Sequence, residues 1–312
     1  MSAAKGPAEL VGLDGKVVIV TGASSGLGAQ WSPVLAAAGA SVVLEARREA
    51  ELTEVAAKAP GSLVVACDVT VEGDRRRLHD ETIRAFGHVD VLVNNAGIAA
   101  SSPALDTTIY DFRDMIDADL TSVFELTKLV GRSMIERGIG GSIINVASLG
   151  AERSVDRYPL PAYSAAKAGV VALTRSLASE WGHHAIRVNA IGPAFFPTAT
   201  AGYLQDPDQV EWIKGHTALK RPGAPRRARR PDRLPRERCV DVHHRPALPR
   251  GRWLVGLLSG LSSSRRRPCG PAGTPGLGTA RGCGGRGRSR DLPPRRTARP
   301  QVGRRRRCAR RA

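Results

Sequence analysis

Cysteine, aromatic residues and long apolar runs are all scarce in this 312-residue sequence. No apolar run reaches the ~18 residues that a membrane span requires, which argues against a transmembrane protein. Four of the five cysteines follow residue 225, at spacings that match no zinc or redox motif, and Cys67 alone precedes it, as suits a reducing compartment. The first 15 residues lack the charged-then-apolar pattern of a secretion signal, so we expect a cytoplasmic protein.

Lysine is absent from the last 87 residues, where arginine is abundant. Residues 1–225 contain 21 Lys+Arg and 25 Asp+Glu, a net charge of −4, whereas residues 226–312 contain 26 Arg and 4 acidic residues, a net charge of +22. Together they give the net charge of +18. A nucleic-acid partner would therefore bind this segment through its phosphates and non-specifically, since the single aromatic residue there, Trp253, offers almost no surface for base stacking.

The segment 226–312 has the composition of a low-complexity tail. Arg, Gly and Pro make up 48 of its 87 residues, and Ile, Phe, Tyr, Met, Asn and Lys are absent. So few apolar side chains cannot offset the entropy of ordering the chain, and we expect disorder. Because the abundant residues have GC-rich codons, our hypothesis is that the reading frame was lost near Pro225. Translating the coding DNA in its other two frames tests it.

Short apolar runs alternate with helical patterns from Lys16 to Pro193. The runs are rich in Val and Ile, as in strands buried on both faces of a parallel sheet. We expect strands at Lys16–Thr21, Ser41–Ala46, Leu63–Ala66, Val89–Asn94, Ser142–Ala147 and Arg187–Ile191, and helices at 26–38, 49–59, 72–86, 109–137, 162–181 and 201–215. This alternation predicts a single α/β domain at residues 1–225, a Rossmann-type doubly wound parallel sheet.

A glycine-rich turn, Thr21-Gly22-Ala23-Ser24-Ser25-Gly26-Leu27-Gly28, follows the first expected strand and opens a helix. Its glycines permit a tight turn that brings backbone close to a pyrophosphate, which the helix N-terminus attracts. The T-G-x-x-x-G-x-G spacing resembles that of classical short-chain dehydrogenases/reductases. Asn94-Asn95-Ala96-Gly97 and Tyr163-x-x-x-Lys167 are also similar to motifs of that family, and the resemblance covers about residues 12–225.

The resemblance implies an NAD(P) site along the carboxyl ends of the strands. Asp68 and Val69 would lie against the adenine ring, and Thr198 would hold the nicotinamide carboxamide. Without the resemblance, a helix-capping or turn residue would be the favoured interpretation of Asp68. The cofactor-binding positions implied by the resemblance are Gly22, Ser24, Ser25, Gly26, Leu27, Gly28, Arg47, Asp68, Val69, Asn95, Ala96, Gly97, Tyr163, Lys167, Pro193 and Thr198.

The residues that carry the chemistry are expected to be Ser148, Tyr163 and Lys167. Tyr163 and Lys167 are four residues apart, so they share one helical face. A nearby ammonium favours a phenolate, and a phenol tuned in this way can give a proton to a carbonyl oxygen or take one from an alcohol. Ser148, at the end of the fifth strand, resembles the serine that orients the substrate in this family, although a capping serine would look the same.

Cofactor choice is expected at the end of the second strand. A carboxylate there would bind the free ribose hydroxyls of NAD(H) and repel a 2′-phosphate. That position holds Ala46, and Arg47 follows, so a guanidinium can pair with the phosphate, which favours NADP(H) over NAD(H). Glu45 should point the opposite way by strand alternation. If the position that contacts the ribose is displaced by one residue, Glu45 would instead be the group that binds the ribose hydroxyls. Alternatively, Arg47 and Arg48 could be solvated residues at the start of a helix.

The most consequential departure from the family is Asp119, where an asparagine is usual. Its carboxylate can pair with Lys167 and weaken the pull of that lysine on Tyr163. We therefore list Asp119 among the catalytic positions and expect reduced or pH-shifted activity.

Four other features of the sequence carry weaker expectations. Ala194 replaces a glycine, which matters if the backbone there needs a positive φ. Pro33 should kink the first helix or displace its start. His183-His184 should point apart on a solvated surface rather than bind a metal. The segment Tyr203–Gly215 could form a lid or pack ordinarily.

The sequence therefore predicts an oxidoreductase that exchanges hydride between NADP(H), or NAD(H), and a small-molecule ketone or secondary alcohol. The family resemblance also implies a homotetramer or dimer and a final helix and strand after residue 225. The tail stands in their place, which argues against assembly. The alternatives are a cofactor-binding pseudoenzyme and, through the tail, a nucleic-acid-binding protein.

Overall fold

The computed structural model describes residues 12–154, 158–196, 206–217 and 219–223. Thr198, the domain boundary at residue 225, the segment 226–312 and the first residues of the helix expected at 201–215 lie outside these ranges. Within the described residues, no helix is both long and apolar enough to cross a membrane.

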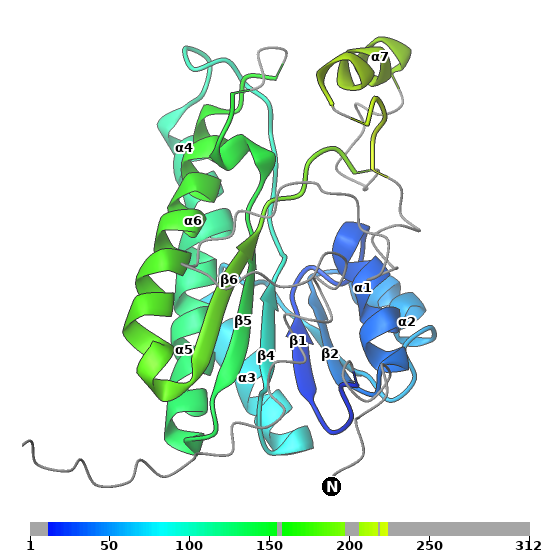
Figure 1. The fold of residues 1–312 in the computed structure, drawn as a ribbon, viewed down its shortest axis with the longest axis vertical. Coiled ribbons are helices and arrows are strands. Elements are labelled where there is room, and N and C mark those ends of the chain that lie inside the picture. The colour runs from blue at the N-terminus through cyan, green and yellow to red at the C-terminus, as the bar shows by residue number, and fades with distance from the viewer. Residues whose placement is uncertain (1–11, 155–157, 197–205, 218, 224–312) are drawn as a thin grey trace, which may run out of the picture. The chain divides into compact units, whose positions relative to one another are not determined.

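Six parallel strands form one sheet in the order β3-β2-β1-β4-β5-β6 (Figure 1). Their bounds are Val17–Val20 (β1), Ser41–Ala46 (β2), Leu63–Ala66 (β3), Val91–Asn94 (β4), Gly141–Val146 (β5) and Ile186–Ile191 (β6). The chain first winds outward from β1 to β3 and then returns to add β4, β5 and β6 on the other side. This order confirms the doubly wound, Rossmann-type fold.

The helices that connect successive strands cover both faces of the sheet (Figure 1), and one more helix follows the last described strand. Their bounds are Gly26–Ala37 (α1), Glu49–Ala56 (α2), Glu72–Phe86 (α3), Ile109–Ile116 (α4), Ser122–Arg137 (α5), Pro161–Trp181 (α6) and Pro207–His216 (α7). The expected helix at 109–137 is thus two α-helices, joined by a π-helical turn at Asp117–Thr121. The start of α1 at Gly26 corrects one alternative for Pro33, because this proline lies inside the helix without displacing its start.

Successive residues of a central strand pack in two separate apolar cores, one on each face of the sheet. On β1, Val18 and Val20 pack in a core with side chains of α1 and α2. Val17 and Ile19 pack in the other core, with side chains of α3, α5 and α6. The alternation of side chains along a strand therefore explains why β1 is apolar at successive positions instead of at every second one.

The last described strand, β6, departs from this pattern. Ile186 and Val188 are buried in the core beside α6, whereas Arg187, Asn189 and Ile191 are half-buried. Among the described residues β6 pairs with β5 alone. The expectation that each strand is buried on both faces is therefore wrong for β6. It is also wrong for β3 at the other edge of the sheet, where Val65 alone is fully buried.

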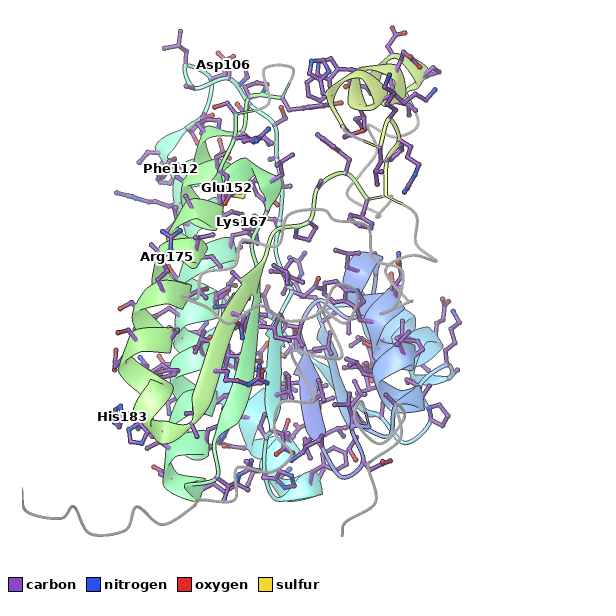
Figure 2. All side chains as sticks on the ribbon, viewed as in Figure 1. Asp106, Phe112, Glu152, Lys167, Arg175 and His183 are labelled. Carbon is purple, nitrogen blue, oxygen red and sulfur yellow. The ribbon has the colours of Figure 1, made fainter. Side chains whose placement is uncertain are left out.

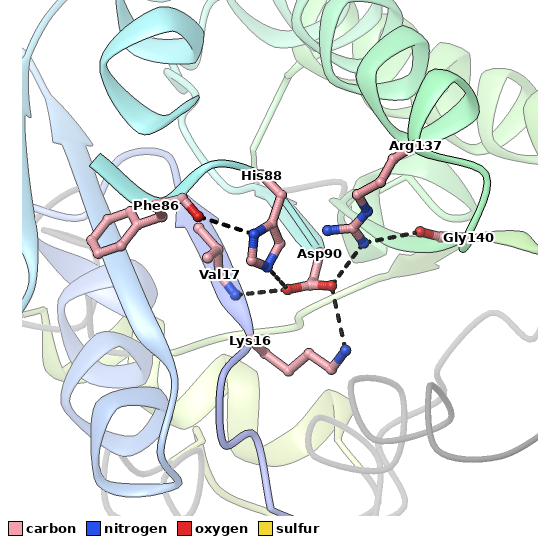
Figure 3. Close-up of polar contacts among 7 residues, drawn as sticks. All are labelled: Lys16, Val17, Phe86, His88, Asp90, Arg137 and Gly140. Carbon is pink, nitrogen blue, oxygen red and sulfur yellow. Dashed lines mark hydrogen bonds and ion pairs between the residues drawn. The ribbon is translucent and has the colours of Figure 1, made fainter. Parts of the chain in front are cut away.

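A buried carboxylate joins the amino ends of two central strands and the end of α5 (Figure 3). Asp90, just before β4, accepts hydrogen bonds from the Val17 backbone N–H at 2.9 Å and from the Arg137 guanidinium at 2.8 Å. Lys16 and His88 complete the cluster, with nitrogen–oxygen distances of 3.4 and 2.9 Å. Burial alone would raise the pKa of Asp90, but these donors and positive charges together lower it below its ordinary value.

Candidate active site

The glycine-rich turn is held at its base by the Asn-Asn-Ala-Gly segment. The Thr21 hydroxyl accepts hydrogen bonds from the backbone N–H groups of Asn95 and Ala96, each at 2.9 Å. The Asn95 amide donates to the backbone oxygens of Thr21 at 2.8 Å and Gly22 at 3.2 Å. Gly22 has a φ of +64°, and a Cβ on Gly28 would lie 2.5 Å from the Gly22 oxygen. Glycine is therefore required at both positions.

At the carboxyl ends of β2 and β3, positive side chains surround Ser24 and Asp68. The Arg48 guanidinium donates to the Ser24 hydroxyl at 3.3 Å, and Arg47 lies 3.9 Å from the Asp68 carboxylate. Asp68 also accepts hydrogen bonds from the backbone N–H and hydroxyl of Thr70. Asp68 therefore stabilises the turn after β3, as the interpretation of this side chain as a turn residue predicts. The Arg47 side chain is 71% exposed, so an anion from solvent can reach its guanidinium beside Asp68.

Glu45 lies beneath the glycine-rich turn. Its side chain contacts Cys67 on the same face of the sheet as Val43, while Ala46 packs on the opposite face. It thus points away from Ala46, as alternation predicts, and is 1% exposed. One carboxylate oxygen accepts from the Gly22 backbone N–H at 3.2 Å. Sequence reasoning missed this contact, because it treated the face opposite Ala46 as remote from the cofactor.

The tyrosine and lysine of the expected active site lie on α6, and Figure 2 labels Lys167 on this helix. The Lys167 ammonium is 5.7 Å from the centroid of the Tyr163 ring. It donates to the Val146 backbone oxygen at 3.1 Å and lies 3.0 Å from the Asp119 carboxylate. Both members of this ion pair are buried, with side-chain exposures of 5% for Lys167 and 0% for Asp119.

The π-helical turn places Asp119 against Lys167. Besides the ion pair, Asp119 accepts a hydrogen bond from the Ile98 backbone N–H at 2.7 Å, which joins this turn to the segment after β4. A Cβ on Gly97 would lie 3.0 Å from the Asp119 carboxylate and 3.2 Å from the Lys167 ammonium. The final glycine of Asn-Asn-Ala-Gly is therefore needed so that the chain can pass the ion pair.

Ser148 follows β5 and faces the same space as Tyr163. A Cβ added at Gly150 would lie 3.6 Å from the Ser148 hydroxyl oxygen and 3.7 Å from Cε1 of Tyr163, so both side chains border this point. The Ser148 oxygen accepts from the Gly150 backbone N–H at 3.1 Å, as a capping serine does. Its hydroxyl hydrogen remains a donor for another group, so capping and substrate contact are compatible.

Comparison with known proteins identifies the family. A family model for short chain dehydrogenases matches residues 16–209, which is more than half of the chain. The chain belongs to the short chain dehydrogenase family. It is 37% identical over 205 residues to carbonyl reductase (NADPH) 2 of Sus scrofa, covering 65% of this chain and 81% of the relative. It is also 37% identical over 218 residues to glucose 1-dehydrogenase of Gluconobacter oxydans, covering 68% of this chain and 81% of the relative.

Solved structures agree with this assignment. A gluconate 5-dehydrogenase from Burkholderia cenocepacia, solved in complex with NADP and tartrate, is similar with a TM-score of 0.67 and 28% identity, over 72% of this chain and 88% of that one. This short chain dehydrogenase is therefore an NAD(P)-dependent oxidoreductase that acts on CH–OH groups.

The residues of this dehydrogenase fit a dinucleotide. The side chain of Ser25 does not cap α1, and the first turn of α1 contains no acidic residue. The positive end of α1 is therefore open to an anion. Arg47 and Arg48 add positive charge where the turn meets β2.

The expectation that His183 and His184 point apart was wrong, and a buried network of amide side chains was not predicted. The rings of His183 and His184 do not point apart, since their centroids are 3.8 Å apart in a single turn of 3-10 helix. A buried amide network escaped sequence reasoning altogether. The Asn94 amide donates to Thr127 and to Asn145, each at 2.8 Å, and so ties β4 to α5 and β5. The available signal was an asparagine near the end of each of two apolar strands, Asn94 in β4 and Asn145 in β5.

Around the substrate end, the described part of the expected lid is α7. Trp212 of α7 meets Tyr158 and Phe195 edge to face, at centroid distances of 6.3 and 6.0 Å. Ala194 is not among the described residues with positive φ, so the loss of glycine there causes no backbone strain. The Pro193 backbone oxygen accepts from Leu149 at 3.1 Å, which joins the segment after β6 to the segment after Ser148.

Proposed function

We propose that this chain interconverts a ketone and a secondary alcohol, with Tyr163 as the proton donor and acceptor and NADP(H) as the preferred cofactor. The observation that carries the proposal is the buried Lys167 ammonium 5.7 Å from the centroid of the Tyr163 ring, with Tyr163 and Ser148 both bordering the space at Gly150. When bound, the dinucleotide supplies or accepts the hydride.

The side chains divide the remaining work. Tyr163 gives its phenol proton to the carbonyl oxygen during reduction and takes a proton from the alcohol during oxidation. Ser148 donates its hydroxyl hydrogen to the same oxygen and so orients the substrate. Lys167 stabilises negative charge on the Tyr163 oxygen, while the Asp119 carboxylate at 3.0 Å offsets part of the lysine charge. We therefore expect an active enzyme that Asp119 slows.

The preference for NADP(H) rests on charge at the end of β2. Ala46 places no carboxylate there, and Arg47 and Arg48 lie close to Asp68 and Ser24. A guanidinium binds a phosphate through paired hydrogen bonds. Relatives named for NADPH-dependent carbonyl reduction and an NADP complex support this choice. Relatives that act on glucose and on sugar acids favour a small hydroxylated substrate.

The test follows NADPH absorbance with a panel of small ketones and keto-sugars, for the full chain and for Tyr163→Phe. Removing the phenol oxygen should lower kcat at least about a hundredfold, since general acid–base catalysis contributes 10²–10⁴-fold. NADPH affinity should stay within about twofold, because the ring is retained. Turnover by Tyr163→Phe equal to that of the parent chain would overturn the proposal.

A further inference from the structure

Glu45 joins the end of β2 to the glycine-rich turn through both its side chain and its backbone. Its carboxylate accepts from the Gly22 N–H at 3.2 Å, and its backbone oxygen accepts from the Ala23 N–H at 2.8 Å. The second carboxylate oxygen accepts from the Cys67 thiol at 3.5 Å. We propose that Glu45 positions the glycine-rich turn and that its carboxyl group takes up a proton when the dinucleotide binds. This inference rests on the proposed cofactor site.

The charge on Glu45 depends on pH near neutrality. Burial raises the pKa of this carboxyl to about 7, against the lowering effect of the hydrogen bonds from Gly22 and Cys67. Burial also raises the pKa of the Cys67 thiol, so the thiol stays protonated. The α1 helix contributes no charged residue. The charged or titratable groups on the other elements around Glu45 and Cys67 are Arg47, Arg48, Asp68, Asp74 and Arg77.

The negative charge of a bound dinucleotide determines whether binding favours the protonated or the ionised carboxyl of Glu45. A protonated carboxyl still has an oxygen that can accept from Gly22, so the turn is held in both protonation states. The diphosphate of a dinucleotide is anionic, and the glycine-rich turn that Glu45 contacts would hold it. At a buried site its repulsion of a carboxylate is only weakly screened by salt. Binding therefore favours the protonated carboxyl, and affinity falls as the pH rises above about 7.

The experiment measures NADPH affinity by cofactor fluorescence between pH 6 and pH 9 for the full chain, for Glu45→Gln and for Glu49→Gln. Glutamine imitates the protonated carboxyl at every pH. The parent chain should lose about tenfold in affinity over this range, which corresponds to a shift of one pKa unit on binding. Glu45→Gln should lose much less and bind about tenfold more tightly than the parent chain at pH 9. Glu49 is exposed at the start of α2, so Glu49→Gln should follow the parent chain.

A gain of affinity at high pH is a result that loss of a purely structural contact would not produce. Parallel pH profiles for the parent chain and Glu45→Gln would overturn the inference and leave the cofactor site intact. Failure of the parent chain to bind NADPH at any pH would overturn the proposed function itself.

A second measurement needs no variant. Titration calorimetry with NADH, which has no group that ionises near neutral pH, in two buffers of different ionisation enthalpy should show uptake of about half a proton per site at pH 7. No uptake there would contradict the coupling.

Discussion

Replacing Asp119 with asparagine should make the enzyme faster and the fold weaker. The substitution removes one negative charge at 3.0 Å from the Lys167 ammonium and leaves the shape of the side chain unchanged. The amide oxygen can still accept from the Ile98 N–H, and Lys167 keeps its hydrogen bond to the Val146 oxygen. The two effects therefore arise from charge and can be measured separately.

The stability change follows from the separation and burial of the pair. At an effective dielectric constant of about 20, two unit charges 3.0 Å apart attract by roughly 5 kcal/mol. The cost of burying both charges offsets much of this attraction, while removing one partner of a buried pair costs about 3–5 kcal/mol. The hydrogen bonds that Lys167 and Ile98 retain place Asp119→Asn near 3 kcal/mol. For a domain of this size the loss lowers Tm by about 6–12 °C.

The rate change has the opposite sign. Without the carboxylate, the full charge of Lys167 stabilises the negative charge that develops on the Tyr163 oxygen during proton transfer. A charge at this range changes the proton-transfer barrier by about 1.4 kcal/mol or more, so kcat at pH 7 should rise about tenfold. NADPH consumption at saturating ketone measures kcat, and circular dichroism on heating measures Tm.

Asp114→Asn is the matched control, because Asp114 is an exposed acidic residue on α4 close in sequence to Asp119. It should change neither quantity. A lower Tm with an unchanged or reduced kcat would refute the electrostatic reasoning and leave Asp119 a structural residue. If both quantities stay at the parent values, the ion pair itself is absent in solution.

Two further predictions concern Asp90 and cofactor choice. Asp90→Asn should lower the free energy of unfolding at pH 7 by about 3 kcal/mol, because Arg137 and Lys16 lose a buried carboxylate. The folded-state pKa of Asp90 is depressed, so its contribution is present at neutral pH and disappears as the pH falls through that value. The gap in Tm between the parent chain and Asp90→Asn should close towards pH 3, and an equal gap at both pH values would contradict this account. Arg47→Ser should weaken NADPH binding about tenfold and leave NADH binding within about twofold, since one charge-assisted contact to the 2′-phosphate is lost. Fluorescence titration with both cofactors measures the two affinities. Equal losses for NADPH and NADH would show that Arg47 does not bind the phosphate.

Short-range patterns explain how much of the fold could be predicted from the sequence. Each expected strand is present to within about two residues, because Val and Ile at successive positions satisfy cores on both faces of the sheet. The glycine-rich turn and the Tyr163–Lys167 pair were equally accessible, since each depends on spacing within a few residues along the chain.

The parts that escaped prediction depend on contacts between distant segments. The Asp90 carboxylate meets the Val17 N–H across 73 positions in the sequence, and no local pattern announces that contact. Strand alternation correctly predicted that Glu45 points away from Ala46, but it could not show that the Gly22 N–H donates to the Glu45 carboxylate. The π-helical turn was missed for a different reason: Asp117–Thr121 has ordinary helical composition, and its extra residue is visible only in the hydrogen-bond pattern.

That π-helical turn makes the segment sensitive to length as well as to composition. In an α-helix each residue turns the chain by about 100°, so deleting one residue between positions 117 and 121 would rotate everything before the deletion relative to α5. The helix α5 is held against the sheet by its buried residues Val123, Leu126 and Val130. The parts that rotate would therefore be α4 and Asp119. Homologous chains should therefore rarely gain or lose a residue at these five positions.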